Sequence, residues 1–388
     1  MTVKETAAKY ADYVVEQRRA FHQIPEVSME EYETSAKVKE ELDKMGVSWR
    51  PCGGETGVLA TIGGKKPGKC VLLRADMDGL TVKEETGYEF CSKYEGMMHA
   101  CGHDAHIASL LTAARILKDM EDELAGTVKL AFQPGEEVAK GCKAMIADGA
   151  LEGVNACYSC HVWATVDAGV YNCQPGPRMA SAGMFGITIK GKSGHGSAPH
   201  EGIDVAVVAS AIVNNLQSIV SREMNPMEPV VVTVGKMEVG TRWNVIAGSG
   251  RIEGTTRTFD KEIFVKLPEI ITRIATDTAA AYRATVELDF VDLTTPVVND
   301  PDLAEVAAKA AEKIVGGDKV QEFGKITGGE DFCFFMNEVP GVQAFMGVRN
   351  PEVGAVYPNH DGHFKMDESA LIQSAAIYAQ FAVDFLNR

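Results

Sequence analysis

The sequence lacks the features that mark an exported, a membrane-spanning or a nucleic-acid-binding protein. Residues 1–23 carry charged side chains throughout and contain no apolar stretch of the kind found in a signal peptide. No uninterrupted run approaches the roughly 18 apolar residues that a membrane helix needs. Asp and Glu (54) outnumber Lys and Arg (38), which gives a formal net charge of −16, whereas nucleic-acid binding requires a basic surface. We therefore expect a cytoplasmic protein without a nucleic-acid or membrane partner.

A disulfide framework is not indicated either. The chain has nine cysteines, an odd number, and no export signal, so we expect reduced thiols. The nine histidines are more informative. Apart from His22, they fall into four groups, whereas histidines scattered through a core would not cluster so closely. The groups lie at residues 99, 103 and 106, at 161, at 195 and 200, and at 360 and 363.

The length of 388 residues favours two domains. Apolar residues recur at helical spacing over 11–21, and a second helix is expected over 34–45. Four apolar strand-like runs follow, with an alanine- and leucine-rich helix at 103–120 between the second and the third. This alternation is typical of a mostly parallel α/β sheet with buried strands. The four runs cover residues 57–62, 70–76, 127–133 and 156–163.

The middle of the chain has a different pattern. From about residue 182 the order is strand, helix, strand, strand, helix, strand, which is the ferredoxin-like βαββαβ arrangement of an α+β domain. Further helices are expected at 303–315 and 369–386. We therefore predict a discontinuous catalytic domain formed by residues 1–180 and 294–388. Residues 181–293 are predicted to form an inserted lid and dimerisation domain, because a unit attached by two connections can close over a site.

The segment HACGHDAH at residues 99–106 is the strongest local signal. A thiolate at Cys101 and an imidazole at His103 suit a borderline-soft divalent ion. The alternative interpretation is a helix start with polar capping residues. A second signal is FQPGEE at residues 132–137, where a strand ends and Glu136 and Glu137 follow. One carboxylate could ligate a metal while the other accepts a proton, although such a pair is more often a solvated turn.

Other predicted strand ends carry similar side chains. Asp76 and Asp78 follow one strand, His161 lies at the end of another, and His360 and His363 lie on a loop before the last helix. Each residue has an ordinary structural explanation when it is considered alone. Open α/β sheets place their sites at the carboxyl ends of strands, however, so we expect these groups to converge on one metal site.

Together these segments resemble the M20 metallopeptidase/amidohydrolase family, in particular its branch of N-acyl-amino-acid, hippurate and auxin-conjugate amidohydrolases. The similarity extends from about residue 18 to residue 368, in family order and spacing. It rests on the segments RRAFHQIPE, RADMDGL, MHACGHDAH, FQPGEE, GHGSAPH, NVI, EGTTRTF, GGEDF and a terminal HxxxFxxDE.

The resemblance implies a role for several residues. Glu136 would be the general acid/base and Asp78 would orient a ligand, while Asp76 occupies a position that is a metal-binding histidine in other branches. His195 on the inserted domain would stabilise the oxyanion, reaching in from a second subunit of a homodimer formed through that domain. The implied metal ligands, with Cys101 as the bridge, are Cys101, His103, Glu137, His161 and His360, and the implied contacts to the substrate carboxylate are Asn244 and Arg257.

This chain departs from the family pattern at a few positions. It has GHDAH for GHDGH, NVIA for NVIP, and Asp361-Gly362 after His360, but no implied ligand is lost. The altered loop after His360 and the presence of Cys160 beside His161 leave the substrate preference open.

These parts predict a hydrolase of linear amide bonds. Two divalent metal ions can hold a shared water as hydroxide and polarise the amide carbonyl, and Glu136 can accept the proton and return it to the leaving amine. The expected reaction releases an amino acid and a carboxylic acid from a small N-acyl-amino-acid substrate with a free carboxylate. Mn²⁺ or Zn²⁺ is favoured as the metal, and Co²⁺ or Ni²⁺ is compatible with the mixed donors. The alternative within the same chemistry is a metallo-dipeptidase or carboxypeptidase.

Three other interpretations are less well supported. The CxxCH sequence at residues 157–161 matches a c-type haem attachment motif, but it lies inside an apolar strand and no export signal is present. Residues 63–70 approach a P-loop, but Cys70 replaces the Ser or Thr and a strand follows instead of a helix. A non-catalytic binding protein is disfavoured because the proposed base and all five ligands are present.

Overall fold

The computed structural model describes residues 1–64 and 66–388 and divides them into two compact units. The first unit consists of Met1–Gly176, Val298–Gly324 and Asp331–Arg388. The second consists of Pro177–Val297 together with Lys325–Glu330. The sequence-based boundaries assign 325–330 to the catalytic domain, whereas in the structure this short segment packs with the second unit.

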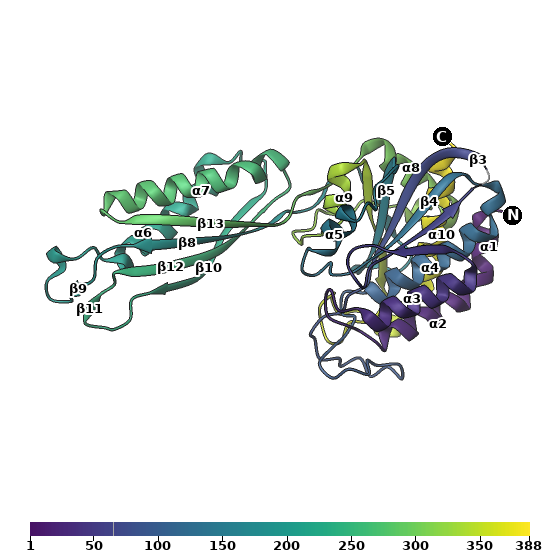
Figure 1. The fold of residues 1–388 in the computed structure, drawn as a ribbon, viewed down its shortest axis with the longest axis horizontal. Coiled ribbons are helices and arrows are strands. Elements are labelled where there is room, and N and C mark those ends of the chain that lie inside the picture. The colour runs from purple at the N-terminus through teal and green to yellow at the C-terminus, as the bar shows by residue number, and fades with distance from the viewer. Residues whose placement is uncertain (65) are drawn as a thin grey trace. The chain divides into compact units, whose positions relative to one another are not determined.

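A seven-stranded sheet forms the centre of the first unit, in the order β1-β2-β4-β3-β5-β15-β6. Its central strands β3, β4 and β5 are labelled in Figure 1. The four strands β4, β3, β5 and β15 pair in parallel, and the remaining strands add antiparallel edges. This confirms the predicted mostly parallel α/β sheet. The strand bounds are β1 Ser48–Pro51, β2 Val58–Gly63, β3 Lys66–Asp76, β4 Ala125–Gln133, β5 Ala156–Asp167, β6 Tyr171–Asn172 and β15 Gly341–Arg349.

Successive residues of the strands point to opposite sides of this sheet, and apolar side chains on both sides are covered by helices. In β3, Val71 and Leu73 join the core beneath the larger helices, while Leu72 joins a second core beneath two short helices. The larger helices are α1 Val3–Ala7, α2 Ala11–His22, α3 Tyr32–Met45, α4 His103–Asp119, α8 Pro301–Val315 and α10 Ser369–Leu386, and the short ones are α5 Gly141–Ala147 and α9 Cys333–Glu338.

The second unit is a four-stranded antiparallel sheet with two helices, in the order β10-β12-β8-β13. Its chain order is β8 Ala182–Lys190, α6 Val205–Ser218, β10 Val230–Val239, β12 Ser249–Thr258, α7 Lys261–Ala281 and β13 Thr285–Thr294. This is the βαββαβ arrangement. Asp204 and Asp260 cap the N-termini of the two helices with their carboxylates, and the helices pack their apolar residues on the sheet.

Two segments are long and apolar enough to cross a membrane by length and composition, Val205–Glu223 and Ser369–Leu386. The sequence shows no uninterrupted apolar run in either, because polar residues such as Asn214 and Gln373 break them. In Ser369–Leu386, 72% of the most apolar window is buried, as in a core helix, and in Val205–Glu223 the figure is 33%. Core helices of other proteins meet the same criterion, so the feature is weak evidence for a membrane span.

Candidate metal centre

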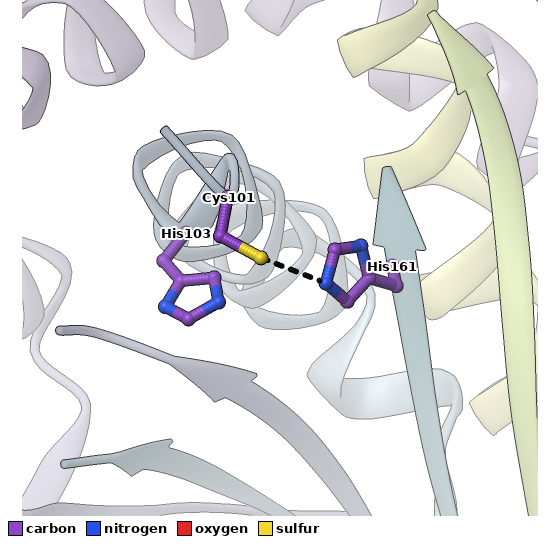
Figure 2. A group of neighbouring side chains, drawn as sticks. All are labelled: Cys101, His103 and His161. Atoms are coloured by element: carbon purple, nitrogen blue, oxygen red, sulfur yellow. Dashed lines mark hydrogen bonds between the residues drawn. The ribbon is translucent and has the colours of Figure 1, made fainter. Parts of the chain in front are cut away.

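Cys101 occupies the centre of the candidate site, in the turn that leads into α4. Gly102 follows it with φ +95°, and a Cβ at this position would lie 2.4 Å from a methyl carbon of Val162, so the turn requires glycine. Cys101 Sγ lies 3.4 Å from His161 Nε2 and 3.3 Å from His360 Nε2. Figure 2 shows the sulfur directed at the His161 ring, with the His103 ring on the opposite side of the sulfur from His161.

The two buried histidines are held with Nε2 directed at this sulfur. His103 Nδ1 lies 2.9 Å from the carbonyl oxygen of Asp78, and His161 Nδ1 lies 2.7 Å from that of Val162. A carbonyl oxygen can only accept, so each neutral ring carries its proton on Nδ1 and leaves the Nε2 lone pair free to bind a metal. His103 Nε2 has no hydrogen-bond partner among residues 1–64 and 66–388.

His360 approaches from a loop with an unusual backbone. Its φ is +71°, a left-handed conformation that is costly for a residue other than glycine. The backbone N–H of His360 donates to the Ala100 carbonyl at 2.8 Å, which ties the loop to the Cys101 turn. Because such strain persists only where the surrounding structure enforces it, the geometry supports a functional role for this side chain.

The turn after β4 brings Glu136 and Glu137 to the site. Glu137 Oε1 lies 3.5 Å from His360 Nε2 and 3.9 Å from His103 Nε2, and it accepts no hydrogen bond from the part of the chain that the structure describes. Glu136 Oε1 accepts the backbone N–H of Asp331 at 3.3 Å. The Asp78 carboxylate accepts the backbone N–H groups of Glu136 at 3.2 Å and of Glu137 at 3.0 Å.

These side chains form two overlapping groups of possible metal ligands. The ligand atoms of Cys101, His103 and His161 lie within 4.8 Å of one another, and so do those of Cys101, Glu137 and His360. The groups share the Cys101 sulfur and together contain all five ligands that the family resemblance implies. A mixed set of sulfur, nitrogen and oxygen donors fits a divalent ion such as Zn²⁺ or Mn²⁺. Within the described residues, His103 Nε2 and Glu137 Oε1 have no hydrogen-bond partner.

The electrostatics of Glu137, Cys101 and His161 point the same way, whereas at His103 burial is outweighed by Asp76 and other neighbours, which raise the pKa of the imidazole well above its usual value. Burial raises the pKa of the Glu137 carboxyl, raises that of the Cys101 thiol well above its usual value, and lowers that of His161 well below its usual value. The protein alone therefore disfavours the charged forms of the thiol and the carboxyl. A bound divalent cation would reverse this balance for both groups, and it needs the neutral imidazole that His161 already favours.

Asp76 has a different environment from the ligand groups. Its Oδ2 accepts from the Arg74 guanidinium at 2.7 Å and its Oδ1 lies 2.5 Å from His106 Nδ1, while the Val162 N–H donates to His106 Nε2 at 2.9 Å. Burial opposes the charge of Asp76, but Arg74 and the two histidines of α4 outweigh it and hold its pKa well below the usual value. Asp76, His103 and His106 are also close enough to form a candidate metal group, but Asp76 and His106 are already occupied by these protein contacts.

Comparison with known proteins agrees with this geometry. Residues 72–384 match the model of peptidase family M20/M25/M40. The chain belongs to the M20 family. It is thus a hydrolase of that family, and the resemblance seen in its sequence is confirmed.

The relatives of this M20 hydrolase include a carboxypeptidase and a deacetylase. It is 38% identical to thermostable carboxypeptidase 1 of Saccharolobus solfataricus, over 100% of this chain and 98% of that protein. It is also 38% identical to N-acetyl-L-cysteine deacetylase of Bacillus subtilis, over 92% of this chain and 84% of the relative. A solved Bacillus subtilis structure, a dinuclear metal-binding peptidase of the M20 family, has a TM-score of 0.88 and 34% identity, with 98% and 99% of the chains covered.

The remaining predicted residues of this M20 hydrolase lie in the second unit. His195 is exposed on the short strand β9 (Gly194–His195), which pairs with β11 (Val245–Ile246) directly after Asn244. The Ser197 backbone N–H donates to His195 Nδ1 at 3.1 Å, so the neutral ring carries its proton on Nε2. Arg257 is half-buried on β12. The structure therefore brings His195 and Asn244 together.

Sequence reasoning missed a buried network next to the Glu136 turn. Arg74 donates to Gln133 Oε1 at 2.8 Å and to Asp331 Oδ1 at 3.0 Å, and Gln133 also donates to the Asp331 carboxylate. Since the Asp331 N–H contacts Glu136, this network helps to fix the position of the carboxylate. Its members lie in the segments RADMDGL, FQPGEE and GGEDF, so their inclusion in family motifs was the available signal.

Proposed function

We propose that this M20 hydrolase is a dinuclear metal-dependent amidohydrolase that releases an amino acid and a carboxylic acid from N-acyl-amino-acid substrates. The observation that carries the proposal is the pair of ligand groups sharing Cys101 Sγ. Glu136 is not one of the five ligands that the family resemblance implies, although its carboxylate also lies within ligand distance of His103 and Glu137. Two divalent ions held there, Mn²⁺ or Zn²⁺ by preference and Co²⁺ or Ni²⁺ as alternatives, would supply water activation and polarisation of the amide carbonyl.

The protein groups then have separate tasks. The Glu136 carboxylate accepts the proton of the attacking water and transfers it to the leaving amine nitrogen. His195 of a second copy of the chain donates from Nε2 to the oxygen of the tetrahedral intermediate, a contact of the oxyanion-hole type that is worth roughly 3 kcal/mol. Arg257 and Asn244 bind the free carboxylate of the amino-acid half, for which the planar guanidinium is suited. Asp78 keeps the proton of His103 on Nδ1 and fixes the turn that carries Glu136 and Glu137.

A carboxypeptidase or dipeptidase activity is the second candidate, and the 38% identity to thermostable carboxypeptidase 1 favours it. Both reactions cleave an amide bond next to a free carboxylate, so the same carboxylate-binding groups serve either. The two differ in what lies on the acyl side of the bond, which is a short acyl group in one case and a peptide in the other. The N-acetyl-L-cysteine deacetylase relative supports the acyl-amino-acid reaction.

The test compares substrates on metal-stripped protein with Mn²⁺, Zn²⁺ or Co²⁺ added back. N-acetyl and N-benzoyl amino acids, free dipeptides and N-blocked peptides are supplied in parallel, and free amino acid is measured. Metal-restored hydrolysis of the acyl-amino acids is the expected result. Cleavage restricted to peptides would support the second candidate, and inactivity on all of them with metal bound would refute both.

Glu136→Gln provides the control for the chemistry. The amide cannot accept the proton, so we expect kcat to fall by roughly 100- to 10,000-fold while two ions remain bound, as measured by plasma mass spectrometry. Turnover close to wild type in that variant would remove Glu136 from the proposed role.

We also propose that the second unit serves as a lid and that two copies of the chain associate through it in the cytoplasm. Strand β10 is an edge of its sheet and exposes Val231 and Met237, and α6 exposes Val207. Light scattering on the purified protein tests the association. A monomer at micromolar concentration, with and without metal, would refute it.

A further inference from the structure

The turn that carries Glu136 and Glu137 is held by two buried carboxylates. Three consecutive backbone N–H groups, those of Gly135, Glu136 and Glu137, donate to carboxylate oxygens. Asp78 accepts the last two. The first donates to Glu31, which lies 104 positions earlier in the chain and to which no role is assigned.

Glu31 is buried with its carboxylate fully occupied. Its Oε1 accepts the N–H groups of Gly135 and Met29, each at 2.7 Å, and its Oε2 accepts the Thr56 hydroxyl at 2.7 Å. The residue is 0% exposed and is the N-cap residue directly before α3. One carboxylate thus connects the loop before α3, the segment before β2 and the turn after β4.

The contact between Met29 and Gly135 is close. Both residues have positive φ, +69° at Met29 and +57° at Gly135, and a Cβ on Gly135 would lie 2.4 Å from Met29 Sδ. A left-handed methionine costs free energy and persists only where its surroundings enforce it. The two hydrogen bonds to Glu31 Oε1 provide that constraint, because they hold the N–H groups of Met29 and of the glycine that packs against it.

We infer that Glu31 is a positioning residue that holds the Glu136 carboxylate in its reactive place through the backbone of Gly135. This inference rests on the proposed role of Glu136. The Glu31 carboxylate binds the Met29 and Gly135 N–H groups and the Thr56 hydroxyl, so its effect on the reaction passes through the turn. A displacement of about 1 Å in a reacting group can reduce a rate by about 100-fold, so the loss of this anchor is expected to reduce kcat more than it changes KM.

The first experiment compares Glu31→Ala with Glu31→Gln in the metal-loaded full-length enzyme. Alanine removes the acceptor, and we expect kcat to fall roughly 10- to 100-fold with KM changed less than threefold. Glutamine can keep its oxygen on Gly135 and Met29 and turn its NH₂ toward the Thr56 hydroxyl, which can rotate to accept. It should therefore restore most of kcat.

A matched control separates positioning from general stability. Glu41 is also a buried glutamate and lies within α3, but it accepts from Tyr13 and Lys44, away from the turn. Glu41→Ala should lower the melting temperature while kcat per metal-loaded molecule stays at the wild-type value. If Glu31→Ala shows the same pattern as Glu41→Ala, with lowered stability and unchanged kcat, the inference is wrong.

A double variant tests whether Glu31 acts through Glu136. In the Glu136→Gln background, Glu31→Ala should cause no further loss of kcat, because the group that it positions no longer works. A loss as large as in the wild-type background would overturn the inference. If Glu31→Ala is insoluble, Glu31→Asp keeps the charge but is one methylene shorter, so a lowered kcat is expected and a wild-type kcat would refute the idea.

Hydrogen exchange gives a readout that does not depend on activity. In metal-loaded Glu31→Ala, a peptide spanning residues 133–141 should exchange faster than in the wild-type enzyme, while α4 stays protected. Inactivity of the wild-type enzyme on every substrate would refute the proposed function, and the exchange result would still decide whether Glu31 holds the turn. Unchanged exchange in this peptide would overturn the inference.

Discussion

Substitution of Asp78 by Asn should weaken metal binding without removing any proposed ligand. The Asp78 carboxylate has four contacts. Its Oδ1 lies 3.2 Å from His103 Nδ1 and accepts the Glu136 N–H at 3.2 Å. Its Oδ2 accepts the Ser28 hydroxyl at 2.6 Å and the Glu137 N–H at 3.0 Å. Every one of these groups can donate. Asparagine has one oxygen and one NH₂, so one of the two positions becomes a donor that faces other donors.

The structure indicates which position the NH₂ takes. At the Oδ1 position it would face His103 Nδ1, which could accept only by moving its own proton to Nε2, the atom needed for the metal. At the Oδ2 position it faces Ser28, whose hydroxyl can rotate, and the Glu137 N–H, which cannot accept. The second orientation is less costly, and it leaves one buried N–H of Glu137 unpaired at a cost of about 1–3 kcal/mol.

The expected magnitude follows from the role of such outer contacts. Loss of the negative charge beside Nδ1 makes Nε2 of His103 less basic and therefore a weaker metal ligand. The unpaired backbone N–H of Glu137 also loosens the position of that second ligand. Changes of this kind typically reduce metal affinity by about 10- to 100-fold, which is about 1.4–2.7 kcal/mol. The assay is chelator competition with Zn²⁺ or Mn²⁺ on stripped wild-type and Asp78→Asn protein. Ser28→Ala is the control, because it leaves the contacts to both glutamate N–H groups in place and should weaken binding less. Equal dissociation constants for Asp78→Asn and wild type would refute the reasoning.

Two further predictions concern the shared sulfur and the response to acid. Cys101→Ala should reduce bound metal from two ions to at most one and abolish turnover, because both ligand groups contain the Cys101 sulfur. Cys157→Ala, in the core on the other face of the sheet, is the control. Two retained ions in Cys101→Ala would contradict the shared-ligand arrangement. At Glu84, burial raises the pKa but hydrogen bonds from His22, Thr86 and the Ser92 backbone outweigh it, and they lower the pKa from 4.5 to about 2. A carboxyl whose pKa is lower in the folded chain stabilises the fold at pH values above its pKa in the unfolded chain. This stabilisation, at most about 3 kcal/mol here, is lost as the pH falls from about 4.5 toward 2. Urea unfolding of metal-free protein at pH 6 and pH 3 should therefore show a smaller difference for Glu84→Gln than for wild type, and equal differences would contradict the assignment.

The sequence predicts the sheet class from local apolar patterns, and the five-ligand set follows from the resemblance of local segments to the family. Apolar runs in β3, β4 and β5 are continuous since these strands are covered on both faces, and the chemical groups follow within a few residues of each run. The position of His161 shows the limit of this reasoning. It was expected at a strand end, but β5 continues to Asp167 because its outer half pairs with β15, a strand that the sequence analysis did not identify. Pairing with β3 does stop at Ser159, so His161 still lies beyond the end of that neighbour.

Buried carboxylates are the part of the site that sequence patterns could not provide. Glu30 and Glu31 are adjacent and chemically identical, yet Glu30 is exposed and Glu31 is 0% exposed. The difference comes from partners that are distant in the chain, because a buried carboxylate is tolerated only where N–H and O–H donors converge on it. For Glu31 these donors come from Met29, Thr56 and Gly135, and only the folded chain brings them together. The same holds for Asp331, which accepts from Arg74 and Gln133 about 200 residues away or more. The metal ligands could be recognised from segments that resemble the family's motifs, whereas the groups that hold them depend on tertiary contacts. Substitutions in this outer layer would therefore best distinguish positioning from simple stability.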